Sequence, residues 1–315
     1  MSISKFTGLG LLGGILTWAA LAQPGNRRSN ASPVELPESS VSIEIEGDYR
    51  VINANGIPNH DHANFPRRGN PHAILPQTHR FKVPLKPEVA EKITPLLRQP
   101  FGVALNGVPM DPGTAEYWNQ DRNSGWRYEA ISGKINLGLD DNHAHVQPSG
   151  AYHYHGLPVG LVELYSKDES MTIIGYAADG FPVYSQFGYR DPKDMESELI
   201  EVKSSFRIKE GTRSGGAGGK YDGTFVQDYE YVEALGDLDE CNGRFGPTPE
   251  HPEGVYHYYI TLDYPFIPRA FRGTPDESFE RQRNRGGDAI RRGGGGRRDE
   301  ERRRPSAEVE HGHAH

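Results

Sequence analysis

Alternating apolar and polar positions run through much of the chain and predict short β-strands. The first clear case is residues 41–46 (VSIEIE), where every second residue is apolar. Another is residues 172–187 (TIIGYAADGFPVYSQF), in which Ala178-Asp179-Gly180 separates two apolar runs, as in a hairpin. Few segments show the 3.6-residue period of an amphipathic helix. The pattern predicts a mainly β, sandwich-like fold of many short strands and hairpins.

Two segments are candidates for short helices. One spans residues 87–98 (PEVAEKITPLLR), although Pro95 lies inside it, and the other lies near residues 192–200. Proline lacks the amide hydrogen that a helix interior needs, so the first helix is expected to be short. We therefore expect one or two short helices beside the strands.

The N-terminal segment has the pattern of a cleaved signal peptide. Residues 1–22 contain Lys5, an apolar run from Leu9 to Leu21, and the small residues Ala20 and Ala22 before the expected cleavage point. The apolar run is shorter than the ~20 residues that a membrane span needs. We expect a secreted or periplasmic (cell envelope) protein with no membrane span after signal cleavage.

The segments next to the signal peptide and at the C-terminus lack the apolar residues of a folded core. Residues 23–40 are expected to form a flexible linker, and residues 277–315 a disordered tail rich in Arg and Gly. Residues 41–276 are left as a single β-rich domain.

Charge and cysteine content restrict the possible functions. Residues 23–272 hold 24 Lys and Arg against 34 Asp and Glu, a net charge of −10. An acidic body argues against nucleic-acid binding and is compatible with binding cations. Cys241 is the only cysteine of the chain, so no internal disulfide is possible. No partner can be named from these features.

Four histidines form two alternating pairs on either side of a turn. His143 and His145 precede a turn centred on Ser149, and His153 and His155 follow it. Side chains two residues apart on a strand share a face, so a hairpin would place His145 opposite His153 and His143 opposite His155. Imidazole ligands without thiolates suit zinc or copper. The sequence predicts a metal site on this hairpin.

Other residues are weaker candidates for chemistry. They are two possible contributors to the metal site, Asp141 and His257; a second chelating pair, His60 and His62; and two acid–base candidates, Asp111 and Glu116. The intervening Tyr152 and Tyr154 would point to the opposite face of the hairpin, where we expect them to belong to the core.

A later part of the chain repeats the histidine hairpin in outline. Residues 139–142 and 150–155 (LDDN, GAYHYH) resemble residues 238–242 and 254–259 (LDECN, GVYHYY). Either an internal duplication or two similar hairpins would produce such a match, and it is too short to decide between them.

The sequence resembles the YHYH-domain family of mostly bacterial exported proteins. The resemblance rests on residues 104–118, 137–161, 173–189 and 221–276, and the family motif corresponds to Tyr152-His153-Tyr154-His155. It implies an exported domain but no particular reaction. Three functions stay open: a metal-binding domain, a metal-dependent extracytoplasmic enzyme that uses the same histidines, and an interaction module without metal.

Overall fold

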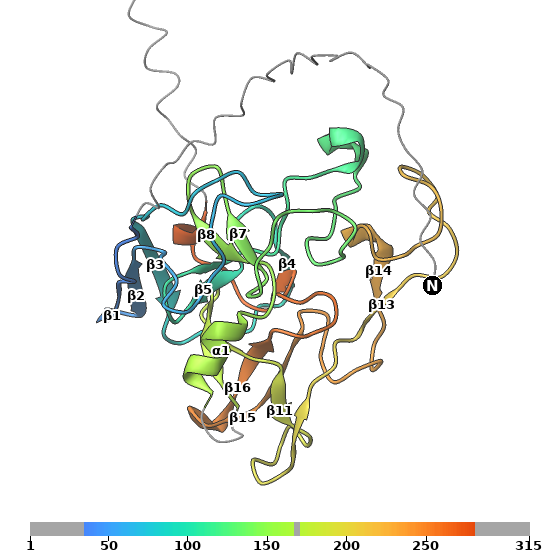
Figure 1. The fold of residues 1–315 in the computed structure, drawn as a ribbon. Helices are drawn as coiled ribbons and strands as arrows, with labels where there is room; N and C mark the ends of the chain where they lie inside the picture. Colours follow the sequence, from blue (N-terminus) through green and yellow to red (C-terminus); the bar gives the residue numbers. More distant parts are fainter. Residues whose placement is uncertain (1–34, 167–170, 281–315) are drawn as a thin grey trace, which may run out of the picture. The chain divides into compact units, whose positions relative to one another are not determined.

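The computed structural model of the chain describes residues 35–166 and 171–280. The predicted signal peptide, most of the predicted linker and the tail from residue 281 lie outside the described residues. The residues described from Leu36 on belong to one compact unit. Strands predominate, and the described part contains a single α-helix, which confirms the prediction of a mainly β fold (Figure 1).

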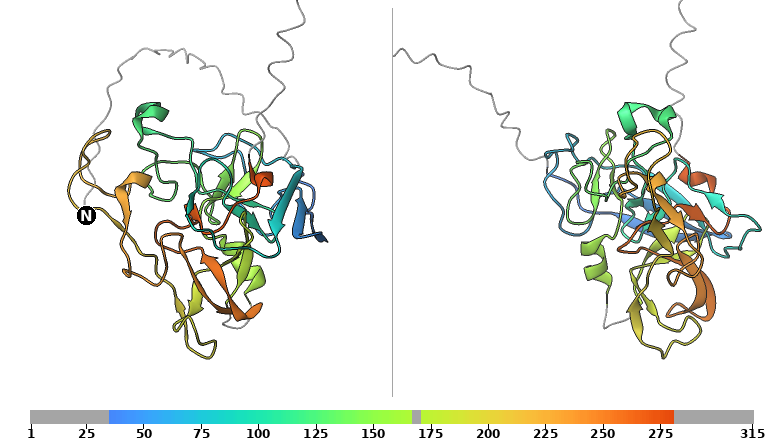
Figure 2. Two further views of the ribbon diagram at one scale, coloured as in Figure 1. Left: turned by 180° about the vertical axis from the view of Figure 1, so that it is seen from behind. Right: turned by 90° about the vertical axis from the view of Figure 1, so that its right-hand side faces the viewer.

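Two sheets account for most of the strands. A three-stranded antiparallel sheet, with β2 in the middle, consists of β1 (Val41–Glu46), β2 (Tyr49–Ala54) and β3 (His79–Pro84). It lies to the left in Figure 1 and to the right in the reversed view of Figure 2. The predicted strand at residues 41–46 is thereby confirmed.

The larger sheet has eight strands in the order β15-β16-β10-β9-β5-β6-β8-β7. In chain order its strands are β5 (Gly102–Ala104), β6 (Pro109–Met110), β7 (Ala144–Val146), β8 (Tyr152–Tyr154), β9 (Ile173–Ala177), β10 (Pro182–Tyr184), β15 (Gly243–Thr248) and β16 (His251–Tyr259).

The remaining elements are short. Three two-stranded ribbons pair β11 (Phe187–Tyr189) with β12 (Leu199–Glu201), β13 (Phe206–Ile208) with β14 (Tyr229–Tyr231), and β17 (Ala270–Phe271) with β4 (Thr94–Pro95). The helical elements are α1 (Val159–Tyr165) and four single 3-10 turns at Trp118–Gln120, Arg122–Ser124, Val226–Asp228 and Glu277–Phe279.

Both predicted helices are wrong in position. Within residues 87–98, Thr94 and Pro95 instead form β4, and Leu96 donates its amide hydrogen to the Arg269 carbonyl, so pairing with a distant strand replaces the helix. In residues 192–200 the side chain of Asp194 accepts from the Glu196 amide, a local turn bond that competes with a helix.

The eight-stranded sheet consists of two halves with the same topology. Each half has an inner hairpin, β5–β6 or β9–β10, whose second strand runs parallel to the second strand of an outer hairpin, β7–β8 or β15–β16. The halves meet where β5 pairs with β9, and Val103 lies opposite Tyr176 at the centre of that pairing. The two outer hairpins therefore lie at opposite edges of one sheet.

The inner hairpins also match in sequence and hydrogen bonding. Residues 104–109 (ALNGVP) correspond to residues 177–182 (AADGFP). The Gly107 amide donates to the Ala104 carbonyl at 2.8 Å, and the Gly180 amide donates to the Ala177 carbonyl at 3.0 Å. Both glycines have a positive φ, 78° and 98°, which a glycine adopts without a Cβ clash. The similarity noticed at the outer hairpins thus extends across all four strands of each half.

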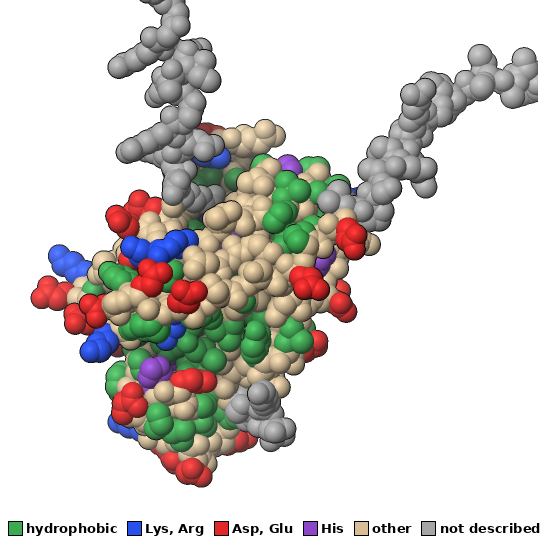
Figure 3. Space-filling model, turned by 90° about the vertical axis from the view of Figure 1, so that its left-hand side faces the viewer, with side chains coloured by type: hydrophobic (Ala, Val, Ile, Leu, Met, Phe, Trp, Pro, Cys, Tyr) green, Lys and Arg blue, Asp and Glu red, His purple; other side chains and the backbone are tan. Residues whose placement is uncertain are grey.

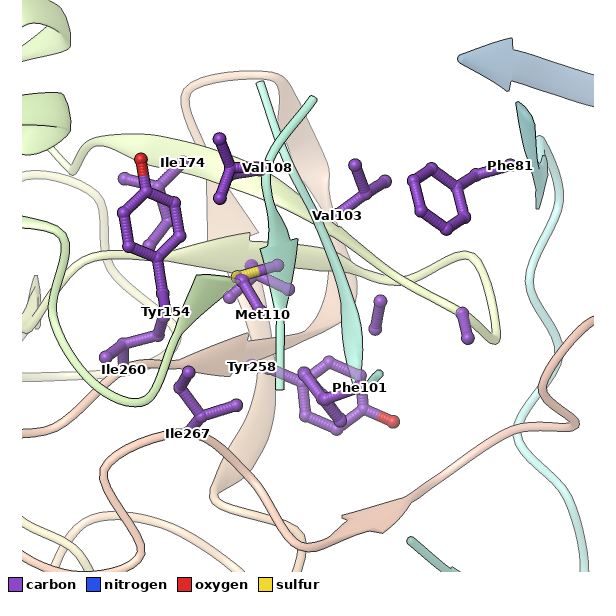
Figure 4. Close-up of a cluster of buried hydrophobic side chains, with 14 of the residues drawn as sticks. Phe81, Phe101, Val103, Val108, Met110, Tyr154, Ile174, Tyr258, Ile260 and Ile267 are labelled. Carbon is purple, nitrogen blue, oxygen red and sulfur yellow. The ribbon is translucent and has the colours of Figure 1, made fainter. Parts of the chain in front are cut away.

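The main core lies against the central strands of this sheet. Tyr154 on β8 and Tyr258 on β16, at matching positions of the two halves, point into one cluster of fully buried side chains that includes Phe101, Met110 and Ile174 (Figure 4). This arrangement confirms that the tyrosine face of the histidine hairpin belongs to the core.

On the face drawn in Figure 3, acidic side chains are more common than basic ones, and apolar side chains are exposed between them. No helix within residues 35–166 and 171–280 is long and apolar enough to cross a bilayer.

Candidate metal centre

Three of the four predicted histidines converge on one side of the β7–β8 hairpin. The strand register places His145 opposite His153, as predicted from the turn at Ser149. One ring nitrogen from each of His145, His153 and His155 lies within 4.8 Å of the other two. The tightest pair is Nε2 of His145 and Nε2 of His155, 3.1 Å apart. Two nitrogens bound to one tetrahedral zinc, each about 2.0–2.1 Å from it, lie about 3.3 Å apart.

Burial favours the neutral form of two of the three rings. His153 and His155 are buried, whereas His145 is partly exposed. Burial lowers the pKa of His145. Burial, together with the neighbouring His153 and His145, lowers the pKa of His155 well below its ordinary value. Neutral imidazole is the form that binds metal ions, so His145 and His155 are ready for a cation at neutral pH.

Backbone carbonyls orient two of the three rings. Nδ1 of His145 lies 2.8 Å from the Leu137 carbonyl, and Nδ1 of His153 lies 3.2 Å from the Ala151 carbonyl. A carbonyl can only accept a hydrogen bond, so each Nδ1 carries the proton and the lone pair of the neutral ring is on Nε2. Such outer contacts are typical of histidines that bind metals.

The third ring, His155, cannot satisfy both of its nitrogens. Its Nδ1 is buried near the Pro112 carbonyl but closes no well-formed hydrogen bond. If Nδ1 carries the proton, the Nε2 lone pairs of His155 and His145 face each other at 3.1 Å. If Nε2 carries it and donates to His145, a bare Nδ1 is left facing a carbonyl. A cation between the Nε2 atoms removes both conflicts.

His143 has a different place from the one predicted for it. Its φ of 52° puts it in the left-handed region, and its Nδ1 lies 2.9 Å from the Leu157 carbonyl. The His155 amide does donate to the His143 carbonyl, so the predicted backbone pairing is present, but the His143 ring is not among the three clustered rings. A turn residue just before the strand does not follow the strand's alternation, which is why the spacing misplaced this side chain.

The weaker candidates lie apart from the three rings. Asp141 is exposed. His257 is buried in the second outer hairpin, where its Nε2 lies 2.8 Å from the Tyr259 hydroxyl. Nε2 of His60 lies 2.6 Å from the Tyr154 hydroxyl, on the tyrosine face of the first hairpin. The ring of His62 lies 6.0 Å from that of Tyr152, on the same face. None of these four belongs to the three-histidine group.

Two carboxylates lie near the histidine cluster. Asp111 follows β6, which pairs in parallel with β8, and its Oδ2 accepts from Nε2 of Gln147 at 3.3 Å. Gln147 is two residues beyond His145 and therefore on the same face. The negative charges of Glu116 and Asp111 partly offset the effect of burial on the His145 pKa. Both acids were singled out in the sequence as acid–base candidates.

Arg269 is a neighbour of the cluster that the sequence did not indicate. Its guanidinium donates to the Pro112 carbonyl at 2.8 Å and to the buried carboxylate of Glu129 at 2.6 Å. Its positive charge contributes to lowering the His155 pKa. Arg269 comes more than a hundred residues after His155, so only the folded chain reveals this proximity.

A family model described as YHYH protein matches residues 80–273, a span that contains both outer hairpins and the three clustered histidines. No curated protein and no solved structure matches the chain. The match covers more than half of the chain and agrees with the segments that carried the resemblance. The chain belongs to the YHYH protein family.

Proposed function

We propose that this protein is an exported metal-binding protein that holds one transition-metal ion at His145, His153 and His155. The observation that carries the proposal is the 3.1 Å contact between two Nε2 atoms, in a cluster where either protonation state of His155 leaves a buried nitrogen unsatisfied. Buried polar atoms without partners are costly, and a metal ion would satisfy all three rings. The signal-like sequence of residues 1–22 supports export.

The donor set favours zinc or copper. Three neutral imidazoles offer nitrogen ligands without thiolate, a set that suits zinc and copper and does not suit calcium or magnesium. Cys241, the only thiol, is buried in the other half of the sheet, and burial raises its pKa. A thiolate ligand at this centre is therefore not part of the proposal.

The second outer hairpin gives independent support. It keeps the tyrosines and aspartate that hold the hairpin together, but Arg244 and Tyr259 stand where the first hairpin has His145 and His155. The fold therefore does not require histidine at these positions. Their presence in the first hairpin is better explained by a ligand than by packing.

The test is the metal content of the purified full chain. Three C-terminal histidines, His311, His313 and His315, are first replaced by Gln so that they bind no metal, and no affinity tag is used. Mass spectrometry of the elements should find one zinc or copper per chain. The His153→Ala/His155→Ala variant should lose it, and the matched control His257→Ala should keep it.

Two results would overturn the proposal. One is a metal-free protein whose stability does not change when zinc or copper is added, as expected of an interaction module. The other is a bound metal that stays in the His153→Ala/His155→Ala variant, because the ion would then be held elsewhere.

A further inference from the structure

The three histidines do not supply a full coordination shell. Zinc and copper sites have at least four ligands. Where the protein supplies only three, water or substrate takes the fourth position. Among residues 35–166 and 171–280, the only grouping of His, Cys, Asp and Glu side chains close enough to share an ion is this set of three. The nearby carboxylates of Asp111 and Glu116 influence His145 but are not members of it.

The side of His145 is where an external ligand has access. His153 and His155 are buried to within 2% of full burial, while His145 is partly exposed. Glu116, whose charge acts on His145, also lines an open hollow of about 390 Å³ together with Tyr117, Tyr128 and Lys134. Arg269 and its partner Glu129 lie near His155.

The charges on the open side disfavour an anion. Glu116 and Asp111 both act on His145, whereas the cation of the hollow, Lys134, has a carboxylate oxygen of Asp222 3.8 Å from its Nζ. The Arg269 charge is compensated by Glu129, with 2.6 Å between Nη2 and Oε2. The carboxylates of Glu116 and Asp111 weaken the attraction between the positive metal ion and a negative ligand, whereas they affect a neutral donor much less.

Resting on the metal-binding function proposed above, we propose that the bound metal has an exchangeable position on the His145 side. This position takes ligands with a neutral nitrogen or oxygen donor in preference to anions. Glu116 and Asp111 act as specificity-determining residues through their charge and do not bind the metal themselves.

Cobalt(II) provides the test, because its visible spectrum changes when a ligand at the metal is exchanged. The full chain, with the three C-terminal histidines replaced by Gln, is loaded with cobalt and titrated separately with imidazole and with azide. Both should change the spectrum while the cobalt content stays at one per chain. In the Glu116→Gln variant the azide affinity should rise about threefold to tenfold, the effect of removing one nearby charge, and the imidazole affinity should change less than about twofold.

Glu253→Gln is the matched control, since Glu253 is an exposed acid in the β15–β16 hairpin, at the far edge of the sheet. This variant should change neither affinity. A cobalt spectrum that neither imidazole nor azide moves would overturn this inference, because the shell would already be complete. An azide affinity that is the same in Glu116→Gln and Glu253→Gln would overturn the selectivity. Failure to bind zinc, copper or cobalt would instead overturn the metal-binding function itself.

Discussion

The two outer hairpins, β7–β8 and β15–β16, share their backbone plan but differ on one face. In each, an aspartate before the first strand, Asp140 or Asp239, accepts hydrogen bonds from two backbone amides of the hairpin and from a tyrosine hydroxyl. In each, the residue three positions after the aspartate, His143 or Asn242, has a positive φ, 52° or 59°. The two hairpins therefore share the same turn, strand register and tyrosine face.

The two hairpins differ in the residues of the opposite face. The first has His145, His153 and His155, and the buried Nδ1 of His155 has no hydrogen-bond partner. The second has His257 at the His153 position, with Tyr259 and Arg244 as its neighbours. There the Tyr259 hydroxyl lies 2.8 Å from Nε2 of His257 and 3.3 Å from the Arg244 guanidinium. In the second hairpin the Tyr259 hydroxyl links His257 to Arg244, whereas in the first hairpin three imidazole rings face one another.

The largest effect is expected when the first hairpin is made to resemble the second. The variant His155→Tyr places at that position the residue that the second hairpin already accommodates. Removing a ligand should weaken zinc binding by more than the about 100-fold that loss of an outer-shell partner costs. Competition with a chelator of known affinity measures the change. An unchanged zinc affinity would show that His155 is not a ligand.

A comparable loss of stability is expected from the shared aspartates. Asp140→Ala and Asp239→Ala each leave a tyrosine hydroxyl and backbone amides without an acceptor, and each should lower the free energy of unfolding by about 2–4 kcal/mol. Urea denaturation of the metal-free protein measures both variants. If only one of them is destabilised, the two hairpins do not rely on the same device.

A smaller effect concerns acid stability and the second hairpin. Burial lowers the pKa of His257 to about 4, whereas in the unfolded chain it is about 6.5. Between these values the unfolded state binds the extra proton, so stability is full above pH 6.5 and falls as the pH falls toward 4. The loss amounts to roughly 3 kcal/mol.

Urea denaturation of the metal-free protein at pH 7 and pH 4.5 tests this pH dependence. His257→Gln has no group that titrates there, so this variant should lose less stability on acidification than the unmodified chain. Equal losses in the two proteins would mean that folding does not lower the pKa of His257.

The smallest effect is expected from the reverse exchange. Arg244→His together with Tyr259→His gives the second hairpin the three histidines of the first. It should bind a second, weaker zinc ion, because Tyr184 in β10 corresponds to Asp111, which follows β6 in the first half, so no carboxylate stands at that position. Isothermal titration would show two unequal sites per chain. A single site would mean that ligands outside the hairpin are essential.

Much of the histidine hairpin could be predicted from its sequence. The strand alternation and the Pro-Ser-Gly turn were sufficient to place His145 opposite His153, since register in a short hairpin is set by its turn. The same reasoning failed for His143, whose left-handed backbone interrupts the alternation. A local pattern predicts side-chain direction only as far as the strand extends.

Features that depend on distant contacts could not be predicted. The helix α1, at Val159–Tyr165, is too short to show a clear period, and the expected helix at residues 87–98 gives way to pairing with β17. Arg269 and Glu116 reach the histidines only through the fold. The repeat of four strands was noticed in sequence only at the outer hairpins, because residues 104–109 and 177–182 of the inner ones are identical at only three of six positions.

An anomalous-scattering map tests the proposed metal centre directly. The crystals contain the full chain with the three C-terminal His→Gln substitutions and are grown with zinc. We expect one strong peak at the zinc edge within bonding distance of His145, His153 and His155, and none at Arg244, His257 and Tyr259. A map without a peak at the first hairpin, or with equal peaks at both hairpins, would overturn the proposed site.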